Sequence, residues 1–110
     1  MNDQFVESFN FLSEVVNRNA IAKGFWDDDR NDGEMICLMH SELSEALEAL
    51  RHGNPPDGHI PEFSGTEAEF ADVIIRIMDF AHARGLRVAD AVIAKMAYNA
   101  NRPHKHGKSF

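Results

Sequence analysis

Apolar side chains recur along this chain at intervals of three and four residues, the spacing of one helix face. In the first segment, this stripe consists of Phe5, Phe9, Leu12, Val16 and Ala20. The stripe predicts a helix that ends near Gly24, because glycine readily takes the left-handed conformation that closes helices. No stretch of useful length alternates apolar and polar residues as a strand does, so the pattern predicts an all-α fold.

A second helix is predicted over 34–51, with Asp32 as the residue that caps its first turn. Its apolar positions fall on one arc when successive residues are placed about 100° apart. Pro55 and Pro56 prevent the helix from continuing. Irregular segments as long as 53–65 are more often functional or mobile than simple connections, so we expect a mobile loop there.

The third predicted helix is apolar around most of its circumference. Ser64 and Glu67 have the spacing of a capping box at its start, and Gly85 follows its expected last residue, near Arg84. Because so many of its positions are apolar, we expect this helix to be the central and most buried one. A fourth helix is predicted over 88–101, and a short basic tail follows.

Chain length and composition constrain the architecture and the cell compartment. Residues 1–110 are enough for one domain, but a chain of this size buries only about two-thirds of its unfolded surface. We therefore predict a four-helix bundle completed by oligomerisation. The sequence contains neither an apolar run of about 18 residues nor a signal peptide, so we expect no membrane partner. Cys37 is the single cysteine, which excludes an internal disulfide and a cysteine-rich zinc site and favours a cytoplasmic protein.

Charge is distributed unevenly along the chain. The formal net charge is −7, from 11 basic and 18 acidic residues, which disfavours a nucleic-acid polymer as partner. Six of the basic residues but only one acidic residue, Asp90, lie in 84–110, so the basic tail at 103–110 continues a basic segment. An acidic body can hold cations and a basic segment can hold anions, although solubility alone would also explain the charges.

Two acidic pairs are the strongest candidates for chemistry. Glu42 and Glu45 on the second helix, and Glu69 and Asp72 on the third, are each three residues apart and share a helix face. If the helices pack antiparallel, the four carboxylates repel one another, and a divalent cation is the natural counter-charge. Oxygen ligands suit Mg²⁺ or Mn²⁺ better than zinc. The alternative is that these acids lie on solvated helix faces.

Basic and aromatic residues provide candidates for substrate binding. Lys95, Asn99 and Arg102 follow one another at helical spacing, so they form a face suited to phosphate, which Lys108 would extend. The alternative is again a solvated face. Trp26 could stack on a nucleobase, and a packing role in a core or interface is an equally good interpretation.

The order of these motifs carries a resemblance to a known family. Glu-x-x-Glu, then Glu-x-x-Asp, then Lys-x-x-x-Asn-x-x-Arg resembles the MazG-like all-α nucleoside triphosphate pyrophosphohydrolases, and the likeness extends from Lys23 to the end of the chain. The resemblance implies Mg²⁺-dependent cleavage of a (deoxy)nucleoside triphosphate to monophosphate and pyrophosphate, as nucleotide-pool house-cleaning. It also implies an intertwined dimer or tetramer. By resemblance, the catalytic, metal-binding residues are Glu42, Glu45, Glu69 and Asp72. The substrate-binding candidates remain those that the side-chain chemistry suggests: Trp26, Lys95, Asn99, Arg102 and Lys108.

Two other classes of function compete with this interpretation. A non-catalytic acidic helical module for dimerisation or nucleotide binding would use its acids only for solubility. A ferritin-like di-metal bundle would need Glu-x-x-His motifs. Neither His40 nor His82 completes one, because Cys37 and Asp79 stand three residues before them. The ferritin-like bundle is therefore the least supported of the three interpretations of function.

Overall fold

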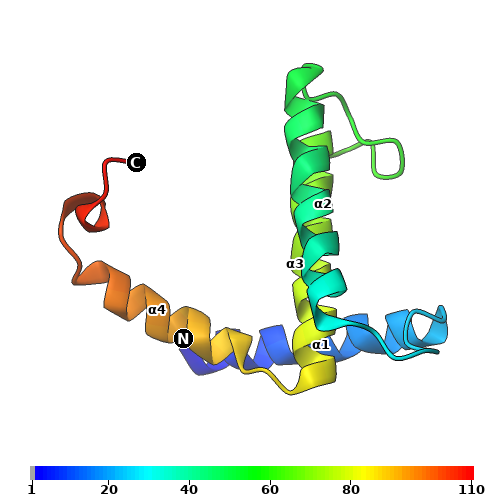
Figure 1. Ribbon diagram of the computed structural model, residues 1–110, viewed down its shortest axis with the longest axis horizontal. Helices are drawn as coiled ribbons and strands as arrows, with labels where there is room; N and C mark the ends of the chain where they lie inside the picture. Colours follow the sequence, from blue (N-terminus) through cyan, green and yellow to red (C-terminus); the bar gives the residue numbers. More distant parts are fainter. Residues whose placement is uncertain (1) are drawn as a thin grey trace.

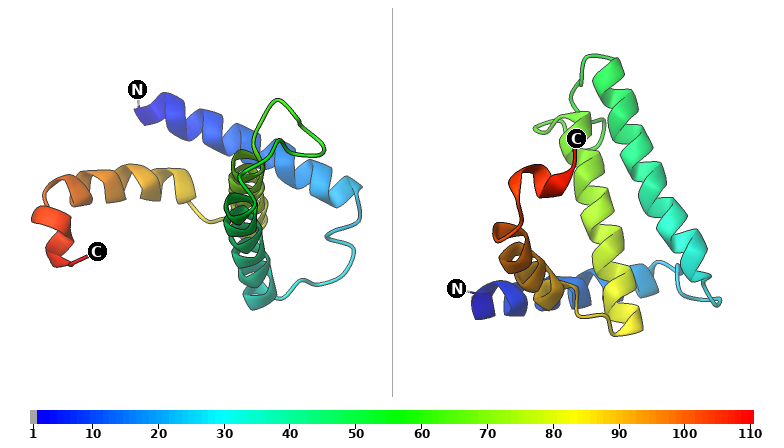
Figure 2. Two further views of the ribbon diagram at one scale, coloured as in Figure 1. Left: turned by 90° about the horizontal axis from the view of Figure 1, so that it is seen from above. Right: turned by 60° about the vertical axis from the view of Figure 1, so that its left-hand side comes forward.

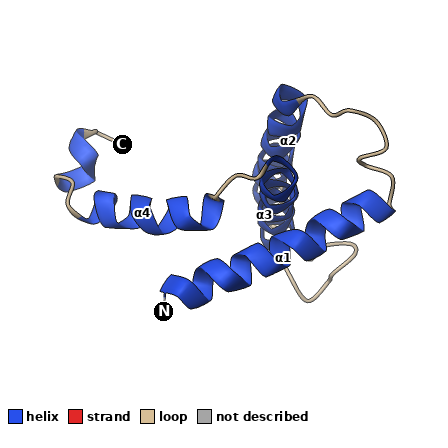
Figure 3. Ribbon diagram, turned by 90° about the horizontal axis from the view of Figure 1, so that it is seen from below, coloured by secondary structure: helices blue, strands red, loops and turns tan. Residues whose placement is uncertain are grey.

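The computed structural model describes residues 2–110, and every regular element in that range is a helix (Figure 3). The elements are α1 (Asn2–Ala22), α2 (Asp32–Arg51), α3 (Gly65–Arg84), α4 (Val88–Ala100) and the short 3₁₀ helix η1 (His104–Gly107). The all-α prediction is therefore confirmed. None of the helices in this range is long and apolar enough to cross a membrane.

An antiparallel hairpin of α2 and α3 forms the body of the molecule (Figure 1). Helix α1 packs crosswise against the C-terminal half of α3 (Figures 1 and 2). Helix α4 leaves the hairpin after the turn at Gly85, touches α1 and extends away with the basic tail. The radius of gyration is 16.2 Å, whereas a compact domain of this length has about 13 Å. A single chain is thus more extended than its length requires.

The helix ends follow from local sequence, with one correction. Ser64 and Glu67 form the predicted capping box: Ser64 Oγ accepts from the Glu67 amide at 3.2 Å, and Glu67 accepts from the Ser64 amide at 2.9 Å. The N-cap of α2 is Asn31, whose side chain accepts from the Glu34 amide at 3.0 Å. The prediction of Asp32 as the cap was wrong, because Asp32 begins the helix and instead pairs with the side chain of Arg84 at 2.9 Å.

The segment between α2 and α3 is tied to the start of α3. The side-chain oxygen of Asn54 accepts from the amide of Thr66 at 3.0 Å and from its hydroxyl at 2.8 Å, and the Gly65 amide donates to Pro55 at 2.9 Å. A side chain at Gly65 would place its Cβ 2.9 Å from Cβ of Ala49, so the hairpin closes here only with glycine. The mobility expected of 53–65 stays a prediction.

The core of the single chain is thin. Its buried apolar residues are Met35, Ala46, Ala68, Met78, Ala81 and Ala89, of which only the two methionines are large. Helix α3 is central, as predicted, but Phe70, Ile74 and Ile75 on it are exposed, with Phe70 52% exposed. The expectation that this helix is buried nearly all round is therefore not met within one chain, because α1 and α2 cover only part of it.

The apolar stripe of α1 faces the core only in part. Phe5 and Leu12 are exposed, and the residues of α1 that are buried are Ser13 and Asn17. The Asn17 amide donates to Asp79 on α3 at 2.8 Å, and this bond turns a polar position of α1 inward. Helical periodicity alone did not reveal which face of α1 would pack.

Candidate metal centre and the adjoining pocket

Three carboxylates from the two hairpin helices converge at one place. Glu42 comes from the middle of α2, and Glu69 and Asp72 lie one turn apart near the start of α3. One oxygen from each residue lies within 4.8 Å of the other two. The antiparallel packing of α2 and α3 thus brings these carboxylates together, and we call the three residues the acidic cluster.

Glu69 has a buried carboxylate oxygen that no hydrogen-bond donor in the described chain satisfies. Its Oε2 is buried and has no hydrogen-bond partner within residues 2–110. Its pKa is raised from 4.5 to about 8, first because the protonated carboxyl is placed to donate a hydrogen bond to Glu42, and then by burial and by the neighbouring Glu45. The pKa of Asp72 is also raised, first by burial and then by repulsion from Glu42. A site that holds a proton near neutral pH for want of positive charge fits a divalent cation bound through oxygen.

Glu45 stands at the edge of this arrangement. Its carboxylate also helps to raise the pKa of Glu69. It lies outside the group whose oxygens fall within 4.8 Å of one another, and it is exposed. The structure therefore brings together three of the four acids implied by the resemblance and leaves the fourth beside them.

Arg76 supplies positive charge to the acidic cluster. Its Nε and Nη2 donate to the same oxygen of Glu42, at 3.2 and 3.1 Å. The side chain of Glu42 is only 12% exposed, and that of Arg76 is 33% exposed. Arg76 is not among the residues that the sequence pattern selected.

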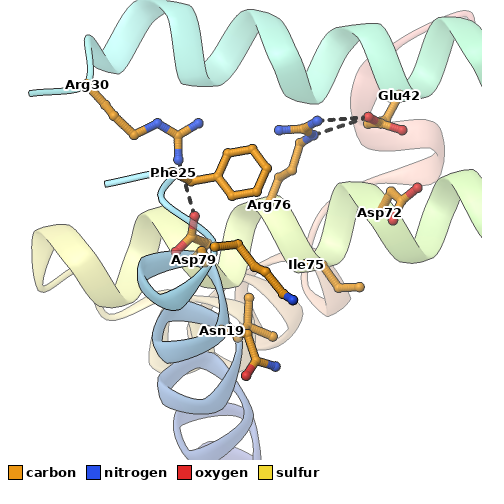
Figure 4. A pocket seen from close by; sticks show the side chains of 11 residues that line it. Asn19, Phe25, Arg30, Glu42, Asp72, Ile75, Arg76 and Asp79 are labelled. Carbon is orange, nitrogen blue, oxygen red and sulfur yellow. Dashed lines mark hydrogen bonds and ion pairs between the residues drawn. The ribbon is translucent and has the colours of Figure 1, made fainter. Parts of the chain in front are cut away.

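A cavity of about 420 Å³ adjoins the acidic cluster (Figure 4). This volume lies within the range of about 300–1,000 Å³ that is usual for small-molecule sites. Glu42, Asp72 and Arg76 line it on the side of the cluster. Its other lining residues are Val16, Asn19, Ala20, Lys23, Phe25, Arg30, Ile75 and Asp79. The cavity therefore joins an apolar wall, three cationic side chains and two members of the acidic cluster.

Asp79 anchors the segment that forms the far wall of this cavity. It accepts from Asn17 at 2.8 Å, from the indole nitrogen of Trp26 at 2.9 Å and from Arg30 at 3.4 Å. The guanidinium groups of Arg30 and Arg84 lie 4.8 and 5.5 Å from the centre of the Trp26 ring. Trp26 is therefore engaged in packing and does not line the cavity, which favours the packing interpretation over base stacking.

The basic residues near the C-terminus gather around an aromatic ring. The Lys95 ammonium and the Arg102 guanidinium lie 5.1 and 5.5 Å from the centre of the Tyr98 ring. Helix α4 ends at Ala100, so Arg102 lies in the turn that follows it. The side-chain oxygen of Asn99 is buried without a hydrogen-bond partner in the described part of the chain.

These basic residues do not meet the acidic cluster within one chain. Helix α4 and the tail with Lys108 extend away from the α2–α3 hairpin (Figure 1). Lys23, Arg30 and Arg76 are the cations placed beside the acidic cluster, and sequence reasoning did not select them. No spacing signal could have done so for Lys23 and Arg30, because only the path of the 23–31 loop brings them to α3.

Comparison with known proteins adds nothing to this geometry. No protein-family model, curated protein or solved structure matches the chain.

Proposed function

We propose that this protein is a divalent-cation-dependent hydrolase that converts (deoxy)nucleoside triphosphates to the monophosphate and pyrophosphate. The observation that carries the proposal is the acidic cluster of Glu42, Glu69 and Asp72, in which a buried oxygen of Glu69 lacks a partner among the described residues. The motif order that resembles the MazG-like pyrophosphohydrolases supports the same reaction. Mg²⁺ is the expected ion, and Mn²⁺ has suitable chemistry.

The residues of the acidic cluster would act together on the ion. Glu42, Glu69 and Asp72 would hold it, with Glu45 beside them. When bound, the ion would neutralise charge on the reacting phosphate and help to generate the attacking hydroxide. Because carboxylates bind metal ions in their deprotonated form, Glu69 would release the proton that its raised pKa retains.

The cavity beside the acidic cluster offers a place for the substrate. Val16, Phe25 and Ile75 provide an apolar wall suited to a nucleoside. Lys23 and Arg30 provide positive charge suited to phosphate groups. A ligand bound here reaches Glu42 and Asp72 directly, since both acids line the cavity.

We further propose that the protein acts as a homo-oligomer, as an intertwined dimer or a dimer of dimers. Phe70 on α3 and Met96 on α4 are 52% and 63% exposed in a single chain, and burying such side chains favours association. A second copy would also allow α4, with Lys95 and Arg102, to approach the acidic cluster of its partner. The exposed apolar surface equally supports the second candidate function, a non-catalytic helical dimerisation module.

One experiment separates the two candidate functions. Purified protein is incubated with a panel of ribo- and deoxynucleoside triphosphates with Mg²⁺ or with a chelator, and pyrophosphate release is measured. The hydrolase proposal expects release with at least one nucleotide, and only when the cation is present. If no nucleotide of the panel releases pyrophosphate and light scattering shows a stable dimer, the dimerisation module is favoured instead.

A further inference from the structure

Arg76 occupies a position between the two charged parts of the site. It follows Asp72 by one helical turn on α3, and its Nε and Nη2 both bond to one oxygen of Glu42 across the hairpin. In Figure 4, the guanidinium group reaches from α3 to the Glu42 carboxylate on α2. The same side chain lines the 420 Å³ cavity.

Three cationic side chains line the cavity beside the acidic cluster. Lys23 and Arg30 line it together with Arg76, and the Phe25 ring lies between the two arginines (Figure 4). Arg30 is already paired with Asp79, at 3.4 Å. The partner of Arg76, in contrast, is Glu42, a residue whose carboxylate would be required by a bound cation.

We propose that Arg76 exchanges its partner, from Glu42 to a phosphate group of the ligand, when the cation and the ligand bind. In the cation-free protein it neutralises Glu42. When a divalent cation takes over Glu42, the guanidinium group turns to a phosphate group of a ligand in the cavity. This inference rests on the proposed cation site, and it assigns to Arg76 a role that links the binding of the cation to the binding of the anionic ligand.

The exchange predicts opposite effects on the two ligands. Without an anion, Arg76 opposes the cation, because it competes for Glu42 and repels a second positive charge nearby. With the cation bound, Arg76 favours binding of the anion, because a guanidinium group released from Glu42 can donate strong hydrogen bonds to phosphate oxygens. Loss of Arg76 should therefore tighten cation binding and weaken anion binding, whereas damage to the fold would weaken both.

The test measures the two binding events separately in the full-length protein. Mn²⁺ binding in the absence of nucleotide is titrated by electron paramagnetic resonance for the wild type, Arg76→Met, Arg76→Lys and the control Arg51→Met. Arg51 is an exposed arginine of α2 whose pairing with Glu48 lies outside the site. Binding of inorganic pyrophosphate at saturating Mn²⁺ is then measured by calorimetry.

We expect Arg76→Met to bind Mn²⁺ about ten-fold more tightly and pyrophosphate about ten-fold more weakly than the wild type, a coupling of ordinary size. Arg76→Lys should fall between them, and Arg51→Met should match the wild type. Unchanged or weaker Mn²⁺ binding by Arg76→Met, or unchanged pyrophosphate binding, overturns the partner exchange. If Arg76→Met fails to fold, Arg76→Gln replaces it under the same criteria. A wild type that binds no Mn²⁺ overturns the proposed function itself, and the exchange with it.

Discussion

Helix α3 carries two carboxylate environments ten residues apart, and they are built in opposite ways. Asp79 is buried and accepts hydrogen bonds from Asn17, Trp26 and Arg30. Glu69 faces Glu42 and other acids, and its Oε2 meets no donor anywhere in residues 2–110. Both side chains lie on the same helix, so the difference comes from what the rest of the chain places against them.

The contrast distinguishes a structural carboxylate, Asp79, from one that is suited to bind a ligand, Glu69. A buried charge that is fully hydrogen-bonded holds its neighbours in place, and removing it leaves the donors unsatisfied. A group of carboxylates without enough donors must instead take up protons or a cation. Asp79 therefore belongs to the fold, and the acidic cluster is a candidate for chemistry.

The largest expected effect tests the acidic-cluster half of this contrast. Asp72→Asn keeps the shape of the side chain but removes the charge of a proposed cation ligand, so turnover should fall by about a thousand-fold. Asp72 is preferable to Glu42, whose neutralisation would also break its ion pair with Arg76. Turnover and melting temperature are measured with Mg²⁺ and with chelator.

The matched control for this substitution is Glu48→Gln, which neutralises an exposed acid of α2 outside the acidic cluster. Mg²⁺ should raise the melting temperature of the wild type and of this control more than that of Asp72→Asn, by mass action on the folded state. Equal Mg²⁺ shifts in all three proteins would rule out Asp72 as a ligand, whatever happens to turnover.

The next largest effect tests whether Asp79 stabilises the fold. Asp79→Ala would leave the buried donor of Asn17 and the partly buried donor of Trp26 without an acceptor, and Arg30 without its partner. The free energy of unfolding should therefore fall by about 3 kcal/mol. Urea unfolding followed by circular dichroism measures the change. Glu62→Ala, at an exposed loop position, is the control and should change stability by less than about 0.5 kcal/mol. A small loss in Asp79→Ala would remove the contrast between the two sites.

A smaller effect is expected from the titration of the acidic cluster. The pKa of Glu69 is raised from 4.5 to about 8, so the folded protein binds this proton more tightly than the unfolded chain. Stability without metal should be greatest below pH 4.5 as far as this group is concerned, and should decline as the pH rises towards 8. The raised pKa of Asp72 acts in the same direction.

Glu69→Gln removes this titration and gives the prediction its test. In chelator, the melting temperature of the wild type should fall by about 5–10 °C more than that of the variant between pH 5 and pH 8.5, equivalent to about 1–2 kcal/mol. The control Glu48→Gln should keep the wild-type slope. If the melting temperatures of the wild type and of Glu69→Gln depend on pH in the same way, the pKa of Glu69 is not raised in the folded protein.

The smallest change in stability is expected outside both sites. Lys95 lies on the exposed part of α4, so Lys95→Ala should change the unfolding free energy by less than about 0.5 kcal/mol. If Lys95 reaches the phosphates of a substrate held by a partner chain, kcat/KM should nevertheless fall by about ten-fold. Unfolding of Lys95→Ala would make Lys95 a structural residue and remove it from the substrate site.

Much of the local structure could be read from the sequence by itself. The positions of all four helices, the capping box at Ser64 and the left-handed end at Gly85 follow from interactions within a few residues. The placement of Glu69 and Asp72 on one helix face follows from the helical repeat alone. These features depend on neighbours in the chain, which the sequence lists directly.

The tertiary structure decided which of these groups meet. The rotation and register of α2 against α3, set by contacts such as the close approach of Gly65 to Ala49, bring Glu42 into the acidic cluster and leave Glu45 at its edge. The polar packing of α1 likewise depends on a bond to a distant residue, Asp79, and the pairing of Asp32 with Arg84 joins the start of α2 to the end of α3. These contacts join residues that are far apart in the sequence, by 16 positions for Ala49 and Gly65 and by 62 for Asn17 and Asp79, and periodicity within one helix carries no information about them.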